Sequence, residues 1–348
     1  MNCNLPVRAA PVPVALNAMA GLCQVLLALA PGDPVSVARL AERFGMSPQQ
    51  ACDSIEGLRA SGLPVLSPSP TSYHLPLPLQ LLDARRIRAL LPTATATQLG
   101  SLEVHFHLDS TSSELQRRGG DAPDLSFVLA EMQSAGRGRR GRQWLSPPGL
   151  NIHVSCLKRF DYRVGDLAGL SLVVGLSVLR ALAALDIRAV GLKWPNDVQA
   201  RSGPDAGGKL AGILVELESG HAGSSTAVIG VGLNLRLTAA MREQVTQATC
   251  DLASLNGGMP PERNLVAATL IAALAEGLQQ FERAGFAPFH AEYAQHDLLC
   301  GRLLQITDAL GACSGIGAGI DARGALRVRV ADGSIRTMDS AEITVQQQ

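Results

Sequence analysis

The sequence predicts an α+β protein in three parts: an N-terminal winged helix-turn-helix, a central domain of alternating strands and helices, and a small C-terminal β-barrel of SH3-like size. Three observations lead to this prediction. Helix caps and stop signals punctuate residues 15–75, strand and helix patterns alternate from Leu102, and short strand patterns separated by glycine turns follow Cys300. At 348 residues the chain is long enough for two or three domains.

The composition excludes several classes of protein. The chain has 30 basic and 30 acidic residues, so it is not a generally basic nucleic-acid binder, and only 3% of its residues are aromatic. Seven cysteines without a Cys-x-x-Cys pair indicate reduced thiols rather than a disulfide framework or a zinc site. The longest apolar run, Leu167 to Leu179, is too short to cross a bilayer, and the N-terminus does not have the pattern of a signal peptide. We therefore expect a cytosolic protein without a membrane partner.

The first part is predicted from its helix boundaries. Ser36 caps a helix that ends at Gly45, and Ser47 caps the next helix with Pro48 at its first position. Gln50 stands three residues after Ser47 and completes a capping box. Apolar strand patterns at 65–66 and 73–75, joined by a Ser/Pro turn, then predict the hairpin that forms the wing.

The role of this winged helix has two interpretations. A helix that reads DNA presents Arg, Lys, Asn or Gln to the base edges, with phosphate contacts nearby. The second helix here carries Asp53 and Glu56 and no basic residue before Arg59, although Gln49 and Gln50 remain candidates for base contacts. The sequence favours a structural or regulatory winged helix over an operator-binding one and leaves both open.

The central domain is predicted to begin after a connecting segment. Residues 81–91 form a helix with three arginines on its solvent side, and the Pro/Thr/Ala run at 92–97 is predicted to be a linker. Strands are then predicted at 102–108, 126–131, 150–157 and 190–194, with a buried helix at 166–185 and an amphipathic helix at 264–283. His105 and His107 lie in the first of these strands without further metal ligands nearby, so no metal site is predicted.

The most unusual stretch is Gly136 to Trp144, GRGRRGRQW, with three glycines and four arginines. Glycines let a backbone bend close to a ligand, and guanidinium groups bind phosphate or carboxylate oxygens. A solvated turn, a targeting signal and a nucleic-acid contact are the alternatives for a basic run of this length. Because the rest of the chain has no net positive charge, the sequence favours a small anionic ligand.

Polar residues at the ends of other predicted strands are further candidates for ligand contact. Asp109 to Ser112 caps a short helix after the first strand, and Asn196 and Asp197 are predicted to turn out beyond the strand that ends at Trp194. Lys209 opens the apolar strand LAGILVELE. In the strand VIGVGLNLRL, Gly230 and Gly232 leave room for a ligand against the backbone.

Taken together, these motifs resemble bacterial biotin-protein ligase, of the class that carries an N-terminal winged helix and also acts as the biotin operon repressor. The resemblance rests on Ser110-Thr111, the run from Gln133 to Trp144, Lys-Trp-Pro-Asn-Asp at 193–197, Lys-Leu-Ala-Gly-Ile-Leu-Val-Glu at 209–216 and Gly-x-Gly-x-Asn at 230–234. It implies a central mixed-sheet α/β ligase domain of the biotin/lipoate ligase type. The predicted boundaries are 1–80 for the winged helix, 81–100 for the linker helix and linker, 101–297 for the catalytic domain and 298–348 for the SH3-like domain.

The resemblance also implies roles for individual residues. The biotin pocket would comprise Ser110, Thr111, Ser112, Gln133, Gly136, Arg137, Gly138, Lys209, Gly212 and Ile213. The nucleotide-binding residues would be Arg139, Arg140, Arg142, Trp144, Asn196 and Asn234. The catalytic residues would be Arg139, Arg140, Lys209 and Asp197, the last as a group that orients or deprotonates the acceptor lysine. Ser112 departs from the pattern, because the best-known repressor-type ligases have asparagine there.

The activity that the resemblance implies is that of a biotin-[acetyl-CoA-carboxylase] ligase. Biotin and ATP, with Mg²⁺, give biotinyl-5'-AMP, and biotin then passes to a lysine of a carrier protein, the biotin carboxyl carrier protein. Operator DNA and a second copy of the chain are the other implied partners. A lipoate or octanoate transferase on the same fold is the alternative, and the Gly/Arg loop disfavours it.

Overall fold

The computed structural model describes residues 16–220, 223–308 and 311–345, and the chain divides into two compact units, Met1–Leu79 and Gln80–Gln348. The six cysteines within the described ranges form no disulfide. In the same ranges, no helix is both long enough and apolar enough to span a membrane.

The first unit packs helices beside a small antiparallel sheet with strand order β1-β3-β2. Its elements are α1 (Leu16–Leu29), β1 (Val35–Ser36), α2 (Val37–Phe44), α3 (Pro48–Ala60), β2 (Leu66–Ser69) and β3 (Ser72–His74). Leu26, Leu40, Ile55 and Leu58 are fully buried and come from all three helices. Helical spacing of apolar residues, which the sequence predicts for α3, therefore builds this core.

The predicted helix boundaries of the first unit are confirmed. The Ser36 side chain accepts a hydrogen bond from Arg39 N, and Gly45 ends α2 with a φ of 62°, a conformation that glycine adopts without strain. At the start of α3, Ser47 and Gln50 form the reciprocal capping box and Pro48 occupies the first turn.

The second unit is organised around a seven-stranded mixed sheet with strand order β4-β5-β6-β10-β9-β8-β7. Strands β4 and β5 are parallel, and the other neighbours are antiparallel. The strands are β4 (Ser101–Leu108), β5 (Ser126–Gln133), β6 (Asn151–Phe160), β7 (Val190–Lys193), β8 (Asp197–Ala200), β9 (Lys209–Ser219) and β10 (Ser225–Asn234). This mixed sheet agrees with the predicted architecture of the central domain.

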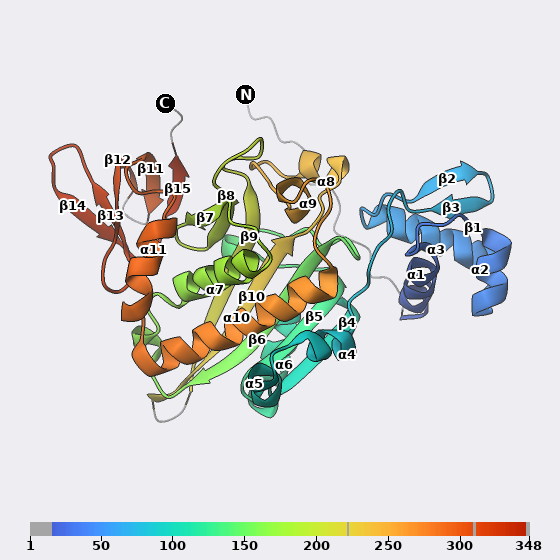
Figure 1. The fold of residues 1–348 in the computed structure, drawn as a ribbon, viewed down its shortest axis with the longest axis horizontal. Coiled ribbons are helices and arrows are strands. Elements are labelled where there is room, and N and C mark those ends of the chain that lie inside the picture. The colour runs from blue at the N-terminus through green and yellow to red at the C-terminus, as the bar shows by residue number, and fades with distance from the viewer. Residues whose placement is uncertain (1–15, 221–222, 309–310, 346–348) are drawn as a thin grey trace. The chain divides into compact units, whose positions relative to one another are not determined.

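Helices cover the two faces of this sheet unequally. Helices α7 (Leu170–Ala184) and α10 (Arg263–Ala284) pack against each other on one face (Figure 1), where the largest apolar cluster lies. Helix α6 (Thr111–Arg118) covers part of the opposite face, above a smaller cluster that includes Leu115 and Leu157. Side chains of a strand alternate between the two faces, so β6 sends Ile152 and Val154 to the large cluster and its odd-numbered neighbours to the α6 face.

The remaining helices surround the sheet. They are α4 (Ala84–Leu90), α5 (Thr93–Gln98), α8 (Ala239–Gln244), α9 (Leu252–Leu255) and α11 (His290–His296), with short 3-10 turns η1 (Gly119–Asp121), η2 (Arg139–Gly141), η3 (Val164–Asp166) and η5 (Ala287–Phe289). The predicted buried helix begins at Leu170 instead of residue 166, because η3 and the left-handed Gly169 precede it.

Two predictions about chain segments are wrong. The linker expected at 92–97 is largely helix α5, in which Thr97 Oγ1 donates to the carbonyls of Thr93 and Ala94, and α4 and α5 both pack on α10. Asp197 is not turned out beyond a strand end but opens β8, which pairs with β7 and β9. In both cases tertiary packing overrides a weak local pattern.

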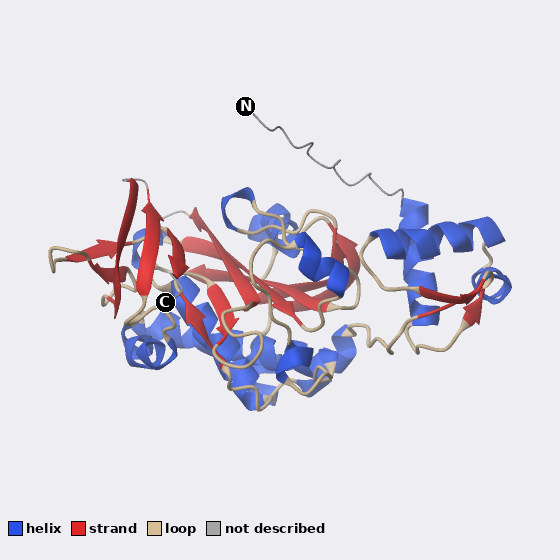
Figure 2. Cartoon of the chain, turned by 90° about the horizontal axis from the view of Figure 1, so that it is seen from above, coloured by secondary structure: helices blue, strands red, loops and turns tan. Residues whose placement is uncertain are grey.

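The C-terminal segment forms a five-stranded antiparallel sheet with order β14-β13-β12-β11-β15. Its strands are β11 (Leu303–Asp308), β12 (Gly311–Ile320), β13 (Leu326–Arg329), β14 (Ile335–Met338) and β15 (Glu342–Val345). This sheet stands at one end of the second unit (Figure 1 and Figure 2). It lies beside α11, which contacts β12 (Figure 1). The inward side chains of Leu304, Leu326 and Val328 belong to the large apolar cluster, so the sheet shares one core with the central domain.

Candidate active site

The floor of the candidate site is a strip of small residues on the α6 face of the central sheet. In register, Ser155 of β6 lies opposite Gly230 of β10, and His153 lies opposite Gly232. On the other side of β10, Gly232 pairs with Gly212 of β9. Three positions without bulky side chains therefore adjoin across neighbouring strands, and they leave a trough directly above the backbone.

One end of the trough is lined by hydroxyl groups. Ser110 caps α6, and this places Thr111 and Ser112 against β6, where their hydroxyls lie 2.7 and 2.9 Å from Ser155 Oγ. Gln133, at the end of β5, accepts a hydrogen bond from Thr111 N at 2.8 Å. All three hydroxyl side chains are buried and can rotate to donate or accept, so this end suits an uncharged polar group.

The Gly/Arg loop folds over the trough as a tight hairpin. Arg137 pairs with Gln143 across the hairpin, and Gly138 N donates to Arg142 O at 2.7 Å. The turn requires a left-handed backbone at Arg140 (φ 57°) and Gly141 (φ 74°). Glycine at 136 is also required sterically, because a Cβ there would lie 2.5 Å from a backbone carbonyl.

The arginines of this loop point to different partners. Arg137 makes a two-pronged ion pair with Glu216 of β9, at 2.6 and 2.8 Å, and anchors the start of the loop. Arg139 donates to Asn196 Oδ1 at 3.2 Å, and burial lowers the pKa of its guanidinium, with a further contribution from neighbouring Arg140. Arg140 and Arg142 instead form ion pairs with Glu342 of the C-terminal sheet and lie outside the pocket lining.

Trp144 lies flat on the glycine floor. A Cβ on Gly232 would be 2.4 Å from Trp144 Cε2, and one on Gly212 would be 2.8 Å from Cζ3. Its indole N–H is buried and has no hydrogen-bond partner among the described residues. The ammonium group of Lys209 stands 5.4 Å from the ring centroid, within cation–π range.

The segment from Trp194 to Asp197 holds the cationic end of the trough in place. Trp194 Nε1 donates to Gly324 O of the C-terminal sheet, and Asn196 exchanges hydrogen bonds with the backbone of Ile213 on β9. Asp197 forms an ion pair with Lys209, Oδ1 to Nζ 2.8 Å, and both side chains are largely buried. The pair holds the lysine side chain in place at the edge of the pocket.

The pocket brings most of the predicted site residues together. The predicted residues that line it are Ser110, Thr111, Ser112, Gln133, Arg137, Gly138, Arg139, Trp144, Asn196, Lys209, Gly212 and Ile213. Five predicted residues are not in the lining, namely Gly136, Arg140, Arg142, Asp197 and Asn234. Asn234 instead donates to the carbonyls of Lys209 and Cys250, because its side chain bridges β10 to the start of β9.

Known proteins resemble this chain over most of its length. It is 35% identical to the bifunctional ligase/repressor BirA of Salmonella typhimurium, covering 91% of this chain and 95% of that protein, and 34% identical to BirA of Escherichia coli, covering 92% and 96%. The profile of the biotin/lipoate A/B protein ligase family matches residues 107–234. The chain belongs to this family.

Solved structures give the same result for the fold of the second unit. Biotin protein ligase from Aquifex aeolicus in complex with biotin and ATP superposes with a TM-score of 0.58 at 25% identity, over 71% of this chain and 99% of that one. The segment matched by the biotin/lipoate ligase family profile, residues 107–234, includes every residue that lines the pocket. The candidate site therefore lies within the part of the chain that defines the family.

Sequence reasoning missed two residues of this pocket, His153 and Ser155. Both lie on β6, are almost fully buried and line the trough. The available signal was their spacing, because they are polar residues at period two in an otherwise apolar strand, NIHVSC. Burial lowers the pKa of His153 to about 3, with a smaller contribution from the charge of Arg263, so the imidazole is neutral.

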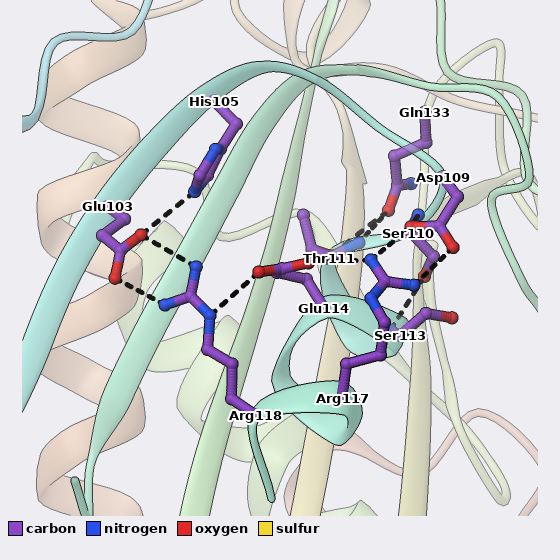
Figure 3. Close-up of polar contacts among 10 residues, drawn as sticks. All are labelled: Glu103, His105, Asp109, Ser110, Thr111, Ser113, Glu114, Arg117, Arg118 and Gln133. Carbon is purple, nitrogen blue, oxygen red and sulfur yellow. Dashed lines mark hydrogen bonds and ion pairs between the residues drawn. The ribbon is translucent and has the colours of Figure 1, made fainter. Parts of the chain in front are cut away.

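An ionic network secures the start of α6, which lies beside the pocket (Figure 3). Arg117 binds Asp109 and Glu114, and Arg118 binds Glu114 and Glu103 of the edge strand β4. Asp109 also accepts a hydrogen bond from Ser110 N at 2.7 Å. The network therefore holds Asp109, which precedes the hydroxyl cluster, against α6 through Arg117. It also ties α6 to β4 through Arg118 and Glu103.

The network predicts an acid-sensitive contribution to stability. Hydrogen bonds from Arg118 to Glu103, and from Arg117 to Asp109 and Glu114, lower the pKa of these carboxyls below their usual 4.5, 3.8 and 4.5. A carboxyl with a lowered folded pKa stabilises the fold above its unfolded pKa, and the contribution is lost as pH falls through the folded value. The pairs are partly exposed, so each contributes about 1 kcal/mol or less.

We expect the combined change Glu103→Gln, Asp109→Asn and Glu114→Gln to lower the unfolding free energy at pH 7 and to have much less effect at pH 3. Urea unfolding followed by tryptophan fluorescence measures this, because both tryptophans lie in the second unit. An equal loss of stability at the two pH values would show that the ionised forms of these three carboxyls do not stabilise the fold.

Proposed function

We propose that this chain is an ATP-dependent biotin-protein ligase, with the activity of a biotin-[acetyl-CoA-carboxylase] ligase. The observation that carries the proposal is the polarity of the trough, which has hydroxyls at one end and the cations Lys209 and Arg139 at the other, with a glycine floor between them. Biotin has the matching order of groups: a neutral ureido ring, an apolar chain and a carboxylate. Membership of the biotin/lipoate ligase family and the names of the relatives support the same function.

The reaction has two steps. A biotin carboxylate oxygen attacks the α-phosphorus of ATP. The bond between the α-phosphorus and the oxygen that bridges it to the β-phosphate breaks, so biotinyl-5'-AMP and pyrophosphate form. A deprotonated lysine amine of the carrier protein then attacks the acyl carbon, and AMP leaves with the electrons of the broken C–O bond. Negative charge develops on the phosphate oxygens in the first step, so fixed cations at that position lower the barrier.

In this proposal each predicted residue keeps a role. Ser110, Thr111, Ser112 and Gln133 bind the ureido ring. Gly136, Arg137 and Gly138 form one wall of the biotin pocket, and Gly212 and Ile213 belong to the other wall. Lys209 and Arg139 lie against the carboxylate and the α-phosphate. Arg140 and Arg142 bind the outer phosphates once they leave Glu342, and Trp144 and Asn196 contact the nucleotide. Asn234 acts indirectly, through the backbone of Lys209.

Asp197 is proposed to orient the acceptor lysine. In the ligand-free chain its carboxylate pairs with Lys209 at 2.8 Å. Once Lys209 engages the phosphate, Asp197 has an oxygen available for an incoming ammonium group. Mg²⁺ is expected to enter with ATP, because phosphate oxygens are ligands that it prefers and no cluster of three or more His, Cys, Asp or Glu side chains occurs in the described ranges.

The test is to incubate the protein with biotin, ATP and Mg²⁺ and to look for biotinyl-5'-AMP by mass spectrometry. An added biotin carrier domain should become labelled on one lysine. If neither adenylate nor labelled carrier forms, the proposal fails. Lipoate and octanoate added in competition should not reduce biotin transfer, and preferential transfer of either acid would favour the transferase alternative.

Arg139→Gly is expected to increase labelling of unrelated lysines by about tenfold. Arg139 closes the loop over the cationic end through Asn196, and its removal lets the reactive mixed anhydride escape. Labelling of a bystander protein is measured by avidin blot. Arg188→Gly, on an exposed surface outside the pocket, is the control, and equal leakage from both variants would contradict the role of the loop.

We also propose the domain assignment that the sequence predicts, with the first unit as a winged helix-turn-helix (1–80), then the linker segment (81–100), the catalytic domain (101–297) and an SH3-like domain (298–348). Support comes from the α2–α3 pair followed by the β2–β3 hairpin, and from the five short antiparallel strands at the C-terminus. The carrier protein and a second copy of the chain are the proposed protein partners.

A second candidate function is repression through operator DNA. The first unit and the names of the BirA relatives favour it. The charges of α3 oppose it, because its only basic residue, Arg59, is bound to Val65 O and Glu56 and stacks on Tyr73. We expect no sequence-specific gel shift on the organism's own biotin-synthesis promoters, with or without biotinyl-5'-AMP. A specific shift that requires the adenylate would instead establish the repressor role.

A further inference from the structure

His153 is a buried polar side chain at the pocket that has no hydrogen-bond partner among the described residues. It is 1% exposed, and both ring nitrogens are without a partner in the part of the chain that the structure describes. A buried polar group without a partner costs folding free energy, so its presence at a ligand pocket indicates that a bound molecule supplies the partner.

The position of His153 shows which part of a ligand it faces. It lies opposite Gly232 in register, and Gly232 lies opposite Gly212, where the Lys209 ammonium group is 3.1 Å from the Cβ position. The hydroxyl groups of Thr111 and Ser112 gather around Ser155, two residues further along β6 and opposite Gly230. His153, Gly232 and Gly212 therefore form one row across three neighbouring strands, and the Lys209 ammonium group lies at the Gly212 end of this row. Gly230 belongs to the next row, opposite Ser155.

A second buried donor lies above Gly232, the residue opposite His153. Trp144 Nε1, which also has no partner among the described residues, lies 2.7 Å from the Cβ position of Gly232. Two residues with unused hydrogen-bonding groups therefore adjoin Gly232, Trp144 above it and His153 opposite it in register. The floor around Gly232 is separate from the ureido-binding hydroxyls and adjoins the cation that would bind the α-phosphate.

The chemistry of His153 limits the partner. Its imidazole is neutral, since burial lowers its pKa to about 3, and a neutral imidazole has one N–H donor and one nitrogen acceptor. A phosphate or carboxylate oxygen only accepts hydrogen bonds, so it can bind only at the N–H. A hydroxyl both donates and accepts, so it can bind at either ring nitrogen. Next to the α-phosphate of a nucleotide, the nearest hydroxyls are those of the ribose.

We propose that His153 binds a ribose hydroxyl of the nucleotide and makes the enzyme selective for ribonucleotides. This inference rests on the proposed ligase function. It assigns to the chain a nucleotide contact that neither the loop motif nor the Lys-Trp-Pro-Asn-Asp segment contains.

The experiment compares ATP, 2'-deoxyATP and 3'-deoxyATP in biotinyl-5'-AMP formation by the full chain. The wild type should lose about tenfold in kcat/KM with the deoxynucleotide that lacks the bonded hydroxyl. In His153→Phe the discrimination should fall to about twofold or less, because the group that reads the hydroxyl is gone. In His153→Asn, which has a donor and an acceptor, part of the discrimination should return. His107→Phe, a half-buried histidine of β4 outside the pocket lining, should discriminate like the wild type.

Biotin binding by calorimetry shows that each variant is folded, and if His153→Phe does not bind biotin, His153→Asn and His153→Ala decide the result. Equal use of all three nucleotides by the wild type overturns the proposal without any variant. Undiminished discrimination in the folded His153 variants also overturns it, and leaves the ligase function intact. Failure of the wild type to form adenylate from ATP overturns the ligase function itself.

Discussion

Replacing Lys209 with methionine is expected to lower kcat/KM for biotinyl-5'-AMP formation by about 100- to 1000-fold, the usual effect of removing one fixed group that stabilises charge in a transition state. Lys209 is largely buried, pairs with Asp197 at 2.8 Å and faces the pocket above Gly212. No other lysine lines the pocket. In methionine the stem and its packing remain, and the charge is absent.

The measurement is pyrophosphate release at varied biotin and ATP concentrations. The effect should appear mainly in kcat, because the charge on the α-phosphate grows in the transition state. Lys209→Arg retains a cation and should recover part of the rate. A Lys209→Met enzyme with a normal kcat and an unchanged melting temperature would contradict the assignment of this residue to the reaction.

Gly232→Val is expected to raise the KM for biotin and ATP by about 100-fold. Even a Cβ at this position would lie 2.4 Å from Trp144, so a valine must displace the indole and fill the centre of the trough. Valine suits a β-strand, so the strand itself should tolerate the change. The loss would therefore arise from blocked ligand space rather than from unfolding.

Gly165→Val is the matched control, because a Cβ at Gly165 meets no atom within 4 Å. Its KM values should equal those of the wild type. Melting curves and circular dichroism of both variants show whether they fold. A Gly232→Val protein that binds biotin normally would mean that the ligand does not lie on this floor.

Much of the local structure could be predicted from sequence because its signals lie within a few residues of one another. The capping box of α3 depends on Ser47 and Gln50, three positions apart, and strand β9 is recognisable from an uninterrupted apolar run. The Gly/Arg loop is recognisable for the same reason. The segment at 92–97 was mistaken for a linker because its helix is stabilised by packing on α10, a helix 170 residues later in the chain.

The candidate site was predictable to a smaller extent. Lys209, Thr111 and Arg139 were identified from motifs, and they do line one pocket. His153 and Ser155 were not, because polar residues at period two in a buried strand show only that they share a face, and do not show whether that face binds a ligand. Their importance becomes visible only when β6 is placed beside β10, where both oppose glycines.

The sequence by itself determined the helix boundaries and the resemblance to biotin ligases, and it predicts an anionic ligand for the Gly/Arg loop, since each of these depends on residues close together in the chain. The tertiary structure alone decided that Asp197 pairs with Lys209, that Arg140 and Arg142 meet Glu342, and that Asn234 lies outside the pocket. The physical reason is strand register. Which residues face each other across a sheet depends on the pairing of distant segments, and local periodicity specifies only the face on which each residue lies.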